Sequence, residues 1–247
     1  MKWKFGKVQF ARQLTQNKLP FRCMKHLSKL LRIHDDSNPK HIQWQYNKVV
    51  NLKIAASKIN GVLIKPGEVF SFCNLVGLPT VKRGYLEGME LSRGEARAGI
   101  GGGICQLANL INWMAWHTDL KVIQRSHHSF DPFPDKGRVL PFGSGAAIFW
   151  NYVDLQIANT TQNTYQIVIS FTESTLKGEI RVSDNPKYFY HIHEKNHQFI
   201  KKGDIYYRAN EIWRTVFHKG INGKEPEEIC NELMVKNFAK VKYKIEQ

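Results

Sequence analysis

The stretch Gly99-Ile100-Gly101-Gly102-Gly103-Ile104-Cys105-Gln106 decides how this chain folds, because it joins a flexible backbone segment to an apolar run at one cysteine. Four glycines in five positions supply no core packing, so they predict a turn with positive φ and a close approach of the backbone to another group. The run from Gln106 to His117 repeats large apolar side chains at three- and four-residue spacing, which predicts a buried helix. Cys105 therefore stands where a helix is expected to begin.

A cysteine at the N-terminus of a helix is a candidate nucleophile. The unpaired N–H groups and the helix dipole favour the thiolate there and lower the thiol pKa. The alternative is structural, since glycine-rich turns between a strand and a helix are common and a cysteine in one is often a small buried residue. The spacing alone leaves both interpretations of Cys105 open.

The positive charge is concentrated in the N-terminal quarter of the chain. The formal net charge is +15, and residues 1–60 carry +11 of it, because 13 Lys and Arg are balanced there only by Asp35 and Asp36. Nucleic acid, anionic lipid and a polyanionic cell-wall polymer all offer dense negative charge to such a segment. The sequence shows no zinc-finger spacing, ribonucleoprotein motif or clear helix-turn-helix, so nucleic acid is the least expected partner.

Length and cysteine usage indicate a globular protein of a reducing compartment. A chain of 247 residues is long enough for one main domain with an appendage. Because the sequence lacks an apolar core of signal-peptide length and an 18-residue apolar run, we expect a cytoplasmic protein, with peripheral contact at the inner membrane face through the basic arm. Four cysteines lie far apart without paired metal spacing, which favours free thiols: Cys23, Cys73, Cys105 and Cys230.

Two helices are expected before the glycine stretch. The first, from Met1 to about Asn38, is basic and has a modest apolar stripe, which suits either a bilayer surface or packing on its own domain. The second runs from about His41 to Ile59 and ends at the glycine of Asn60-Gly61. We therefore divide the chain into a basic helical N-terminal arm, residues 1–45, and a domain of residues 46–247.

Strands are expected through most of the remaining sequence. Short apolar or alternating runs bounded by turn residues predict them at 62–64, 69–72, 89–91, 121–125, 146–150, 153–158, 165–171, 178–182, 188–193, 204–215 and 235–245. The expected fold class is α+β: a single domain in which a central helix bearing Cys105 packs against a mostly antiparallel sheet. Residues 132–145 are expected to form a long irregular connection, and such connections in a compact domain are often functional.

A set of motifs in fixed order resembles the VanW family. The segment from Asn60-Gly61 to Phe72 resembles the opening of that family, and Gly101-Gly102-Gly103-Ile104-Cys105-Gln106 resembles its central signature. His128-Ser129 and Asp154-Leu155-Gln156-Ile157-Ala158-Asn159 are similar to its later landmarks. The resemblance covers residues 45–247 approximately and implies an association with peptidoglycan, its precursors or glycopeptide resistance.

A Cys–His pair for acyl transfer is the sharpest chemical hypothesis. Cys105 would attack an amide or ester carbonyl after an imidazole accepts its proton. His128 is the first choice of base, because it stands at the His-Ser position of the family, and His127 is the second, as its neighbour on the opposite face of an extended chain. Asp131, or less favourably Asp154, would orient the ring.

The developing oxyanion of such a reaction needs hydrogen-bond donors beside the nucleophile. The amides of Gly101, Gly102 and Gly103, together with Gln106, are the candidates, since a helix N-terminus supplies preorganised N–H groups. Simpler roles stay open, because Gln106 could only cap the helix and Asp131 could only shape a turn before Pro132.

Two non-catalytic interpretations stay open. In one, the glycine stretch binds the carboxylate end of a wall precursor, such as a D-Ala terminus or a lactyl group, without turnover. In the other, the protein is an accessory held at the membrane face by its basic arm. Either would leave Cys105 without a chemical step, and the oligomeric state is open in every case.

We expect no metal and no cofactor. His191 and His193 lie on one face of an expected strand with His197 nearby, which is a usable ligand pair. A metal site nevertheless needs three or four ligands, and the sequence offers no acidic or cysteine ligand close to these histidines.

Overall fold

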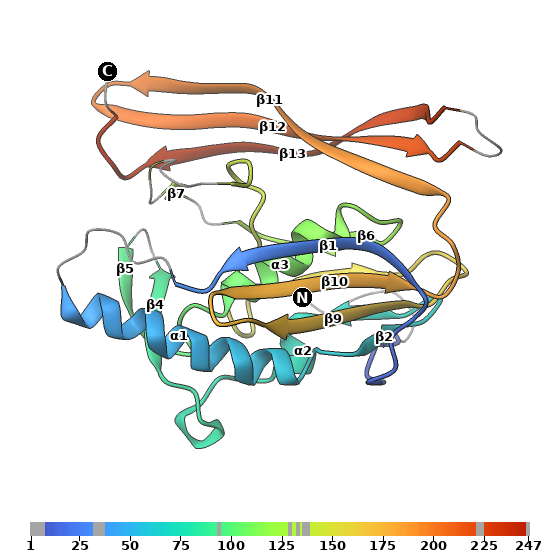
Figure 1. Cartoon of the computed structure of the whole chain (residues 1–247). Coiled ribbons are helices and arrows are strands. Elements are labelled where there is room, and N and C mark those ends of the chain that lie inside the picture. The colour runs from blue at the N-terminus through green and yellow to red at the C-terminus, as the bar shows by residue number, and fades with distance from the viewer. Residues whose placement is uncertain are drawn as a thin grey trace.

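Most of the structure is β-sheet, arranged in several mainly antiparallel sheets (Figure 1). It is a computed structural model that describes residues 8–31, 38–92, 95–127, 130–131, 134, 139–220 and 225–245. Figure 1 shows a C-terminal ribbon of three long strands along one side of the molecule and helix α1 (Pro39–Ser57) along the opposite side. Helix α3 (Cys105–Ala115) lies between them and occupies the centre of the fold.

The described N-terminal segment contains a strand, so the expected basic helix from Met1 to about Asn38 is wrong there. Strand β1 (Phe21–Lys29) pairs antiparallel with β10 (Thr175–Val182) along nearly its whole length. Pairing with β10 satisfies the backbone of this segment, whereas its apolar stripe is too short to bury a helix well. A tertiary partner thus overrides a weak helical pattern, as is common for short segments. The division between an arm and a domain at residue 45 stays a prediction.

The other short strands fall close to their expected positions, except the strand at 95–100, which was not expected. The hairpin of β9 (Tyr165–Phe171) and β10 confirms the predicted one, and its sheet has the order β1-β10-β9-β2. A second sheet has the order β3-β8-β6, and β4 and β5 form a hairpin that leads into the glycine turn. The remaining bounds are β2 (Val62–Ile64), β3 (Val69–Ser71), β4 (Glu87–Ser92), β5 (Glu95–Ile100), β6 (Lys121–Gln124) and β8 (Gln156–Ala158). Of the expected strand 146–150 only an isolated bridge at Phe149 is present.

Both long helices confirm the helical patterns of the sequence. The side chain of Asn38 accepts a hydrogen bond from the Lys40 amide and Pro39 occupies the first turn, so α1 begins with a favourable cap. Helix α3 buries an apolar face in the main core, and Gly178 lets β10 approach it, since a Cβ there would lie 2.5 Å from Met114 Cε. Two short helical turns complete the set, α2 (Phe72–Val76) and η1 (Val81–Arg83). Among the described helices, none has the length and apolar character that crossing a bilayer requires.

The C-terminal sheet is a separate layer beside α3. Its order is β11-β12-β13-β7, with β7 parallel to β13 and the other neighbours antiparallel. The bounds are β11 (Tyr188–Lys202), β12 (Ile205–His218), β13 (Glu227–Val241) and β7 (Phe130–Asp131). A small apolar cluster of Trp113, Trp116, Ile192 and Ile212 joins this sheet to α3. Strand β11 continues well past the predicted segment 188–193 and β13 begins well before the predicted 235–245, whereas β12 lies close to its predicted bounds of 204–215.

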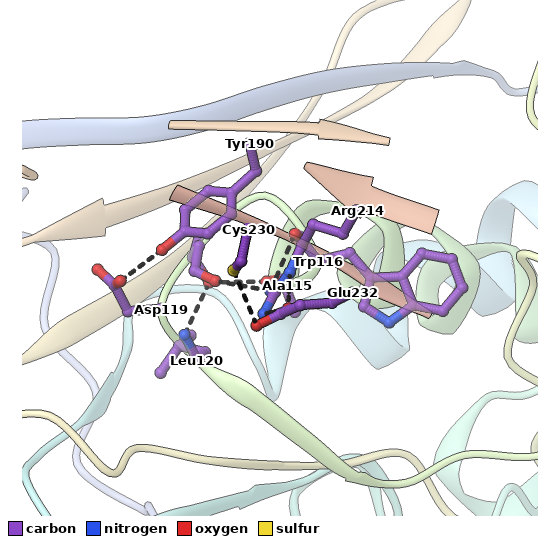
Figure 2. A network of polar contacts seen from close by, with 9 residues as sticks. Ala115, Trp116, Asp119, Leu120, Tyr190, Arg214, Cys230 and Glu232 are labelled. Carbon is purple, nitrogen blue, oxygen red and sulfur yellow. Dashed lines mark hydrogen bonds and ion pairs between the residues drawn. The ribbon is translucent and has the colours of Figure 1, made fainter. Parts of the chain in front are cut away.

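A polar network fastens the C-terminal sheet to the end of α3 (Figure 2). Arg214 of β12 donates to the carbonyl oxygens of Trp116 at 3.3 Å and Thr118 at 3.2 Å, and its Nε donates to Glu232 at 2.8 Å. A cation at the C-terminal end of a helix is well placed, because the last carbonyl groups carry partial negative charge. Nearby, the Tyr190 hydroxyl donates to the Asp119 carboxylate. These contacts set how the sheet lies against the helix that carries Cys105.

Replacing Tyr190 with phenylalanine is expected to lower the free energy of unfolding by about 1–3 kcal/mol, because it removes a hydrogen bond to a carboxylate. Burial and Asp119 raise the pKa of the Tyr190 hydroxyl. The native state therefore keeps this proton when the unfolded chain loses it, so stability is fully present below about pH 10 and falls as the pH rises further. Denaturant unfolding at pH 8 and pH 10.5 measures both effects.

The exposed Tyr152, 78% accessible, is the matched control. Tyr152→Phe should leave the free energy of unfolding at both pH values unchanged, and Tyr190→Phe should reduce the loss of stability between them. Equal alkaline losses in the wild type and Tyr190→Phe would contradict the assigned role of this hydroxyl.

Candidate active site

The glycine turn before α3 is a close contact between two backbone segments. A Cβ on Gly102 would lie 2.2 Å from the carbonyl carbon of Gly88, and one on Gly88 would lie 2.7 Å from the Gly102 carbonyl oxygen. Asn51 of α1, which is fully buried, donates to the carbonyl oxygens of Gly102 and Leu86, each at 3.0 Å, and accepts from the Leu86 amide at 2.8 Å. Glycine is required at this crossing because any side chain would force the segments apart.

The amides of the turn divide into two groups. Gly101 and Gly102 donate their N–H groups to nearby carbonyl oxygens at 2.9 and 3.1 Å. Gly101 and Gly103 adopt positive φ of 84° and 90°, which reverses the chain into the helix. Within the described part of the chain, the amides of Gly103 and Cys105 have no backbone acceptor. Two of the predicted oxyanion donors, Gly101 and Gly102, are therefore engaged with other carbonyl groups, and donation by Gly103 stays a prediction.

Cys105 is the first residue of α3, as the sequence predicts. Its half-buried thiol accepts a hydrogen bond from the Ile148 amide at 3.5 Å. Burial raises the thiol pKa, and the negative charge of Glu90 acts in the same direction, whereas the N–H groups of Ile148 and of Cys105 itself lower it less. The net pKa lies above the ordinary value, so the lowered pKa expected at a helix N-terminus is wrong here. The resting thiol is protonated at neutral pH and needs a base to become a nucleophile.

The extended segment 146–148 connects Cys105 to the strand that precedes the histidine pair. The Ala146 amide donates to Asn109 Oδ1 at 2.6 Å, the Ala147 amide to the Ser126 carbonyl at 2.7 Å, and the Ile148 amide to Cys105 Sγ. Successive amides of an extended chain point in opposite directions. The segment therefore has α3 on one side and Ser126 on the other.

Of the two candidate bases, the structure describes only His127. His127 follows Ser126 directly and is half-buried, so its backbone and the Cys105 thiol flank the same three-residue segment. His128 and Ser129 lie outside the described residues. Segment 146–148 lies between Ser126 and the Cys105 thiol, and a role of either histidine as the base for that thiol stays a prediction.

Asp131, the favoured orienting acid, has strong partners of its own. Its Oδ2 accepts from Arg208 Nη1 at 3.1 Å and from the Tyr243 hydroxyl at 2.9 Å, and the residue is 1% exposed. Both partners belong to the C-terminal part of the chain. The carboxylate thus anchors β7 to the C-terminal sheet, and a direct role beside an imidazole stays a prediction.

Two other predicted residues have structural partners. Asp154 accepts from the Ser71 hydroxyl at 2.6 Å and from the Cys73 amide at 2.9 Å, so it caps α2. The side chain of Gln106 donates to the Ser28 hydroxyl at 2.9 Å and to the Lys29 carbonyl at 2.7 Å, so it ties α3 to β1. Asp154 thus lies beside Cys73, whose charge interacts with that of Cys105. The orienting role of Asp154 and the oxyanion role of Gln106 both stay predictions.

Several residues around the thiol were not singled out by the sequence. Asn109 and Asn112 of α3 hold the segment 144–146 by its Ser144 carbonyl and Ala146 amide. Arg125 donates to the carbonyl oxygens of Gly143 and Gly145 at 2.8 and 2.7 Å. A polar residue on the apolar face of a predicted helix is a signal that could have found the two asparagines.

The three histidines of β11 do not form a metal site among the described residues, where no group of three His, Cys, Asp or Glu side chains is arranged to hold an ion. The rings of His191 and His193 stack with centroids 5.6 Å apart. His197 instead accepts a hydrogen bond from Arg208 Nε at 2.8 Å.

Alkylation of Cys105 by iodoacetamide is expected to be slow at pH 7 and to keep accelerating above pH 9, because the raised pKa keeps the thiol protonated. Peptide mass mapping at successive pH values measures the rate. Cys230, an exposed thiol on β13, serves as the internal control and should react at least roughly tenfold faster at pH 7. A Cys105 rate that reaches its plateau below pH 8 would be incompatible with this environment.

Comparison with known proteins gives a consistent set of relatives. Residues 47–181 match the family model described as VanW like protein. The vancomycin B-type resistance protein VanW of Enterococcus faecalis (strain ATCC 700802 / V583) is 38% identical over 164 residues, which are 66% of this chain and 60% of that protein. The uncharacterized protein YoaR of Bacillus subtilis (strain 168) is 31% identical over 110 residues, 44% of this chain and 34% of that protein. The chain thus matches only part of the length of each relative. No solved structure matches it.

Proposed function

Since the chain belongs to the VanW family, with the family model covering residues 47–181, we propose that it is a cysteine-dependent acyl transferase or amide hydrolase acting on peptidoglycan precursors. The substrate class follows from the relative named for B-type vancomycin resistance, because vancomycin resistance concerns the peptide ends of wall precursors. The proposed partner is thus a precursor peptide bearing an amide or ester near its carboxyl end. Contact of the basic N-terminal region with anionic membrane lipid, on the cytoplasmic side, is part of the same proposal.

The placement of Cys105 is the observation that carries the proposal. The thiol belongs to the first residue of a buried helix and accepts a hydrogen bond from the Ile148 amide, and the Gly103 amide two residues before it has no backbone acceptor among the described residues. Such an N–H group close to a helix N-terminus would suit the oxygen of a tetrahedral intermediate. We therefore place the nucleophile and its oxyanion donor at this turn.

The reaction would proceed through a thioester. The base takes the proton from Cys105, Sγ forms a bond to the substrate carbonyl carbon, and the oxygen becomes an oxyanion near the Gly103 amide. The protonated base returns the proton to the leaving amine or alcohol as the carbon–nitrogen or carbon–oxygen bond breaks. Water or a second amine then attacks the thioester, giving hydrolysis or transfer, and the thiol is restored.

The raised pKa of Cys105 makes the base necessary rather than optional. A thiol that is protonated at rest gives little thiolate at neutral pH, so an imidazole within reach has to remove the proton during attack. His127 and His128 are the candidates, because they follow the residue that pairs with segment 146–148. We assign the base to this pair and rank His128 first on its place in the family motif.

A second candidate function is binding of the same precursor without turnover. The observation that favours it is the environment of the thiol, since the Ile148 amide and burial suit a neutral structural cysteine. In this version, the protein is an accessory that holds a precursor carboxylate at the amides beside Cys105. The negative charge of Glu90 close to the thiol opposes a bound carboxylate, so we place this function second.

Turnover and binding are separated by one assay with the purified chain. Muramoyl-pentapeptide precursors ending in D-Ala-D-Ala or D-Ala-D-lactate are incubated with the protein, products are followed by mass spectrometry, and affinity is measured in parallel by calorimetry. The proposal expects a shortened or exchanged peptide at rates that depend on pH through the histidine pair. Saturable binding with no product would establish the second function instead, and absence of both would overturn the two together.

A further inference from the structure

An ion pair buried at the edge of the C-terminal sheet holds the chain soon after the histidine pair. Arg208 Nη1 of β12 lies 3.1 Å from Asp131 Oδ2 of β7, and the two side chains are only 3% and 1% exposed. The Tyr243 hydroxyl donates to the same carboxylate oxygen at 2.9 Å, and the Lys242 amide donates to the Asp131 carbonyl at 3.0 Å. Both the side chain and the main chain of β7 are therefore fixed to β12 and the chain that follows β13.

The same sheet also holds the far end of the irregular connection. The Phe142 carbonyl accepts from Asn210 Nδ2 at 2.9 Å and from Asn237 Nδ2 at 3.1 Å, and the Arg208 guanidinium lies 4.8 Å from the Phe142 ring centroid. A Cβ on Gly143 would lie 2.1 Å from the Asn237 side chain. Arg208 therefore contacts both ends of the connection.

Further hydrogen bonds connect the chain after Phe142 to the segment beside the thiol. Arg125 holds the carbonyl oxygens of Gly143 and Gly145, and Asn112 of α3 donates to the Ser144 carbonyl at 2.9 Å. Segment 146–148 follows at once, between Ser126 and Cys105. The chain that carries the histidine pair is thus held from Arg125 before it and from Asp131 after it.

We propose that Arg208 is a positioning residue, which holds Asp131 and Phe142 and thereby sets the chain at Ser126 and His127 relative to segment 146–148, the segment that contacts Cys105. The inference rests on the proposed function, since it concerns the base of that reaction. Arg208, Asn210, Asn237 and Tyr243 all lie outside residues 47–181, which match the family model. The C-terminal sheet of this chain therefore completes a site whose chemical groups come from the matched region.

The geometry of the pair explains why arginine is suited to this position. Its planar fork reaches the Asp131 carboxylate with Nη1 and the His197 ring with Nε at once, and its face lies on Phe142. A lysine supplies one compact charge and cannot donate to both of these partners in fixed directions while also stacking on the Phe142 ring. A base has to lie within hydrogen-bond reach of its proton, and small misplacement of a supporting group lowers turnover strongly.

The test compares Arg208→Gln and Arg208→Lys with Arg181→Gln. Arg181 is a matched control, since it pairs with Glu179 at 3.0 Å and donates to the Leu19 carbonyl, on β10 and away from the histidine segment. Turnover of the precursor gives kcat and KM, and hydrogen exchange of the Lys242 and Ala147 amides reports the anchor and the histidine segment. Nuclear magnetic resonance titration of the His127 ring gives a third readout.

The expected result for Arg208→Gln is a kcat lower by about 10- to 100-fold, with KM changed by less than about threefold. Exchange at the Lys242 and Ala147 amides becomes faster, the His127 titration shifts, and Arg208→Lys restores only part of kcat. Arg181→Gln leaves all of these unchanged. If Arg208→Gln does not fold, the double variant Asp131→Leu/Arg208→Met replaces it, since apolar residues can substitute for a buried ion pair without loss of stability.

Two results overturn parts of the account separately. Wild-type exchange, His127 titration and kcat in a folded Arg208 variant would overturn the positioning role. Faster exchange and a shifted titration in that variant, together with full turnover by Cys105→Ser, would overturn the proposed function and leave the anchoring of the histidine segment supported.

Discussion

Cys105→Ser is expected to lower turnover of a wall precursor by at least about 10³-fold, while the affinity for that precursor changes by less than about threefold. Serine is close to cysteine in size and can still accept the Ile148 hydrogen bond, so the fold around α3 is retained. A hydroxyl is a much weaker nucleophile than a thiolate and is not activated by an environment built for sulfur. Steady-state kinetics and calorimetry on the purified variant measure the two quantities.

Cys73→Ser is the matched control for this substitution. Cys73 is also half-buried, lies in the first turn of the short helix α2 and has its thiol 3.7 Å from a carbonyl oxygen. Its replacement should leave turnover within about twofold of the wild type, because Cys73 lies close enough to Cys105 for their charges to interact but takes no part in the proposed reaction. A Cys105→Ser protein that keeps more than a tenth of wild-type turnover would exclude the thiol as nucleophile.

Gly102→Ala is expected to destabilise the protein by more than about 4 kcal/mol, or to prevent folding. The new methyl group would lie 2.2 Å from the carbonyl carbon of Gly88, a rigid backbone atom that cannot give way as a side chain does. Separation of the two segments would also break the buried hydrogen bond from Asn51 to the Gly102 carbonyl. Denaturant or thermal unfolding of the variant measures the loss.

Gly67→Ala is the control for Gly102→Ala. It measures the stability lost when a glycine is replaced where no neighbouring atom blocks the new methyl group. Gly67 has a positive φ of 79°, and a Cβ there would have no other atom within 4 Å. The strain of placing alanine in that conformation costs about 1–2 kcal/mol, so this control should lose clearly less stability than Gly102→Ala. Equal losses for the two variants would show that the Gly88–Gly102 crossing is not tightly packed.

The local elements around the glycine turn could be predicted from the sequence with good accuracy. The start of α3 at Cys105, the extent of α1 and the hairpin of β9 and β10 follow from apolar spacing and turn residues, and all are present. These patterns extend over short segments of the chain, in which the period of a helix or the alternation of a strand can be recognised directly. The membership of the VanW family likewise rests on motifs that are continuous in the sequence.

What failed depended on partners distant in the sequence. β1 is a strand because β10 lies beside it, and the pKa of Cys105 is raised because the thiol is buried by parts of the chain distant in sequence. The role expected for Asp131 beside an imidazole stays a prediction, whereas its buried partner Arg208 was not foreseen, because it lies far along the chain where no local pattern reveals it. The helix N-terminus at Cys105 was predicted correctly, but burial outweighs its effect on the thiol pKa, and burial depends on the tertiary fold.

The most direct test of the account is mass spectrometry of the protein quenched with acid during turnover of a precursor. The account predicts a thioester on Cys105 whose added mass equals the acyl part of the peptide, absent in Cys105→Ser and unaffected by Cys73→Ser. Product formation without any adduct on Cys105, in a protein shown to turn over, would contradict it.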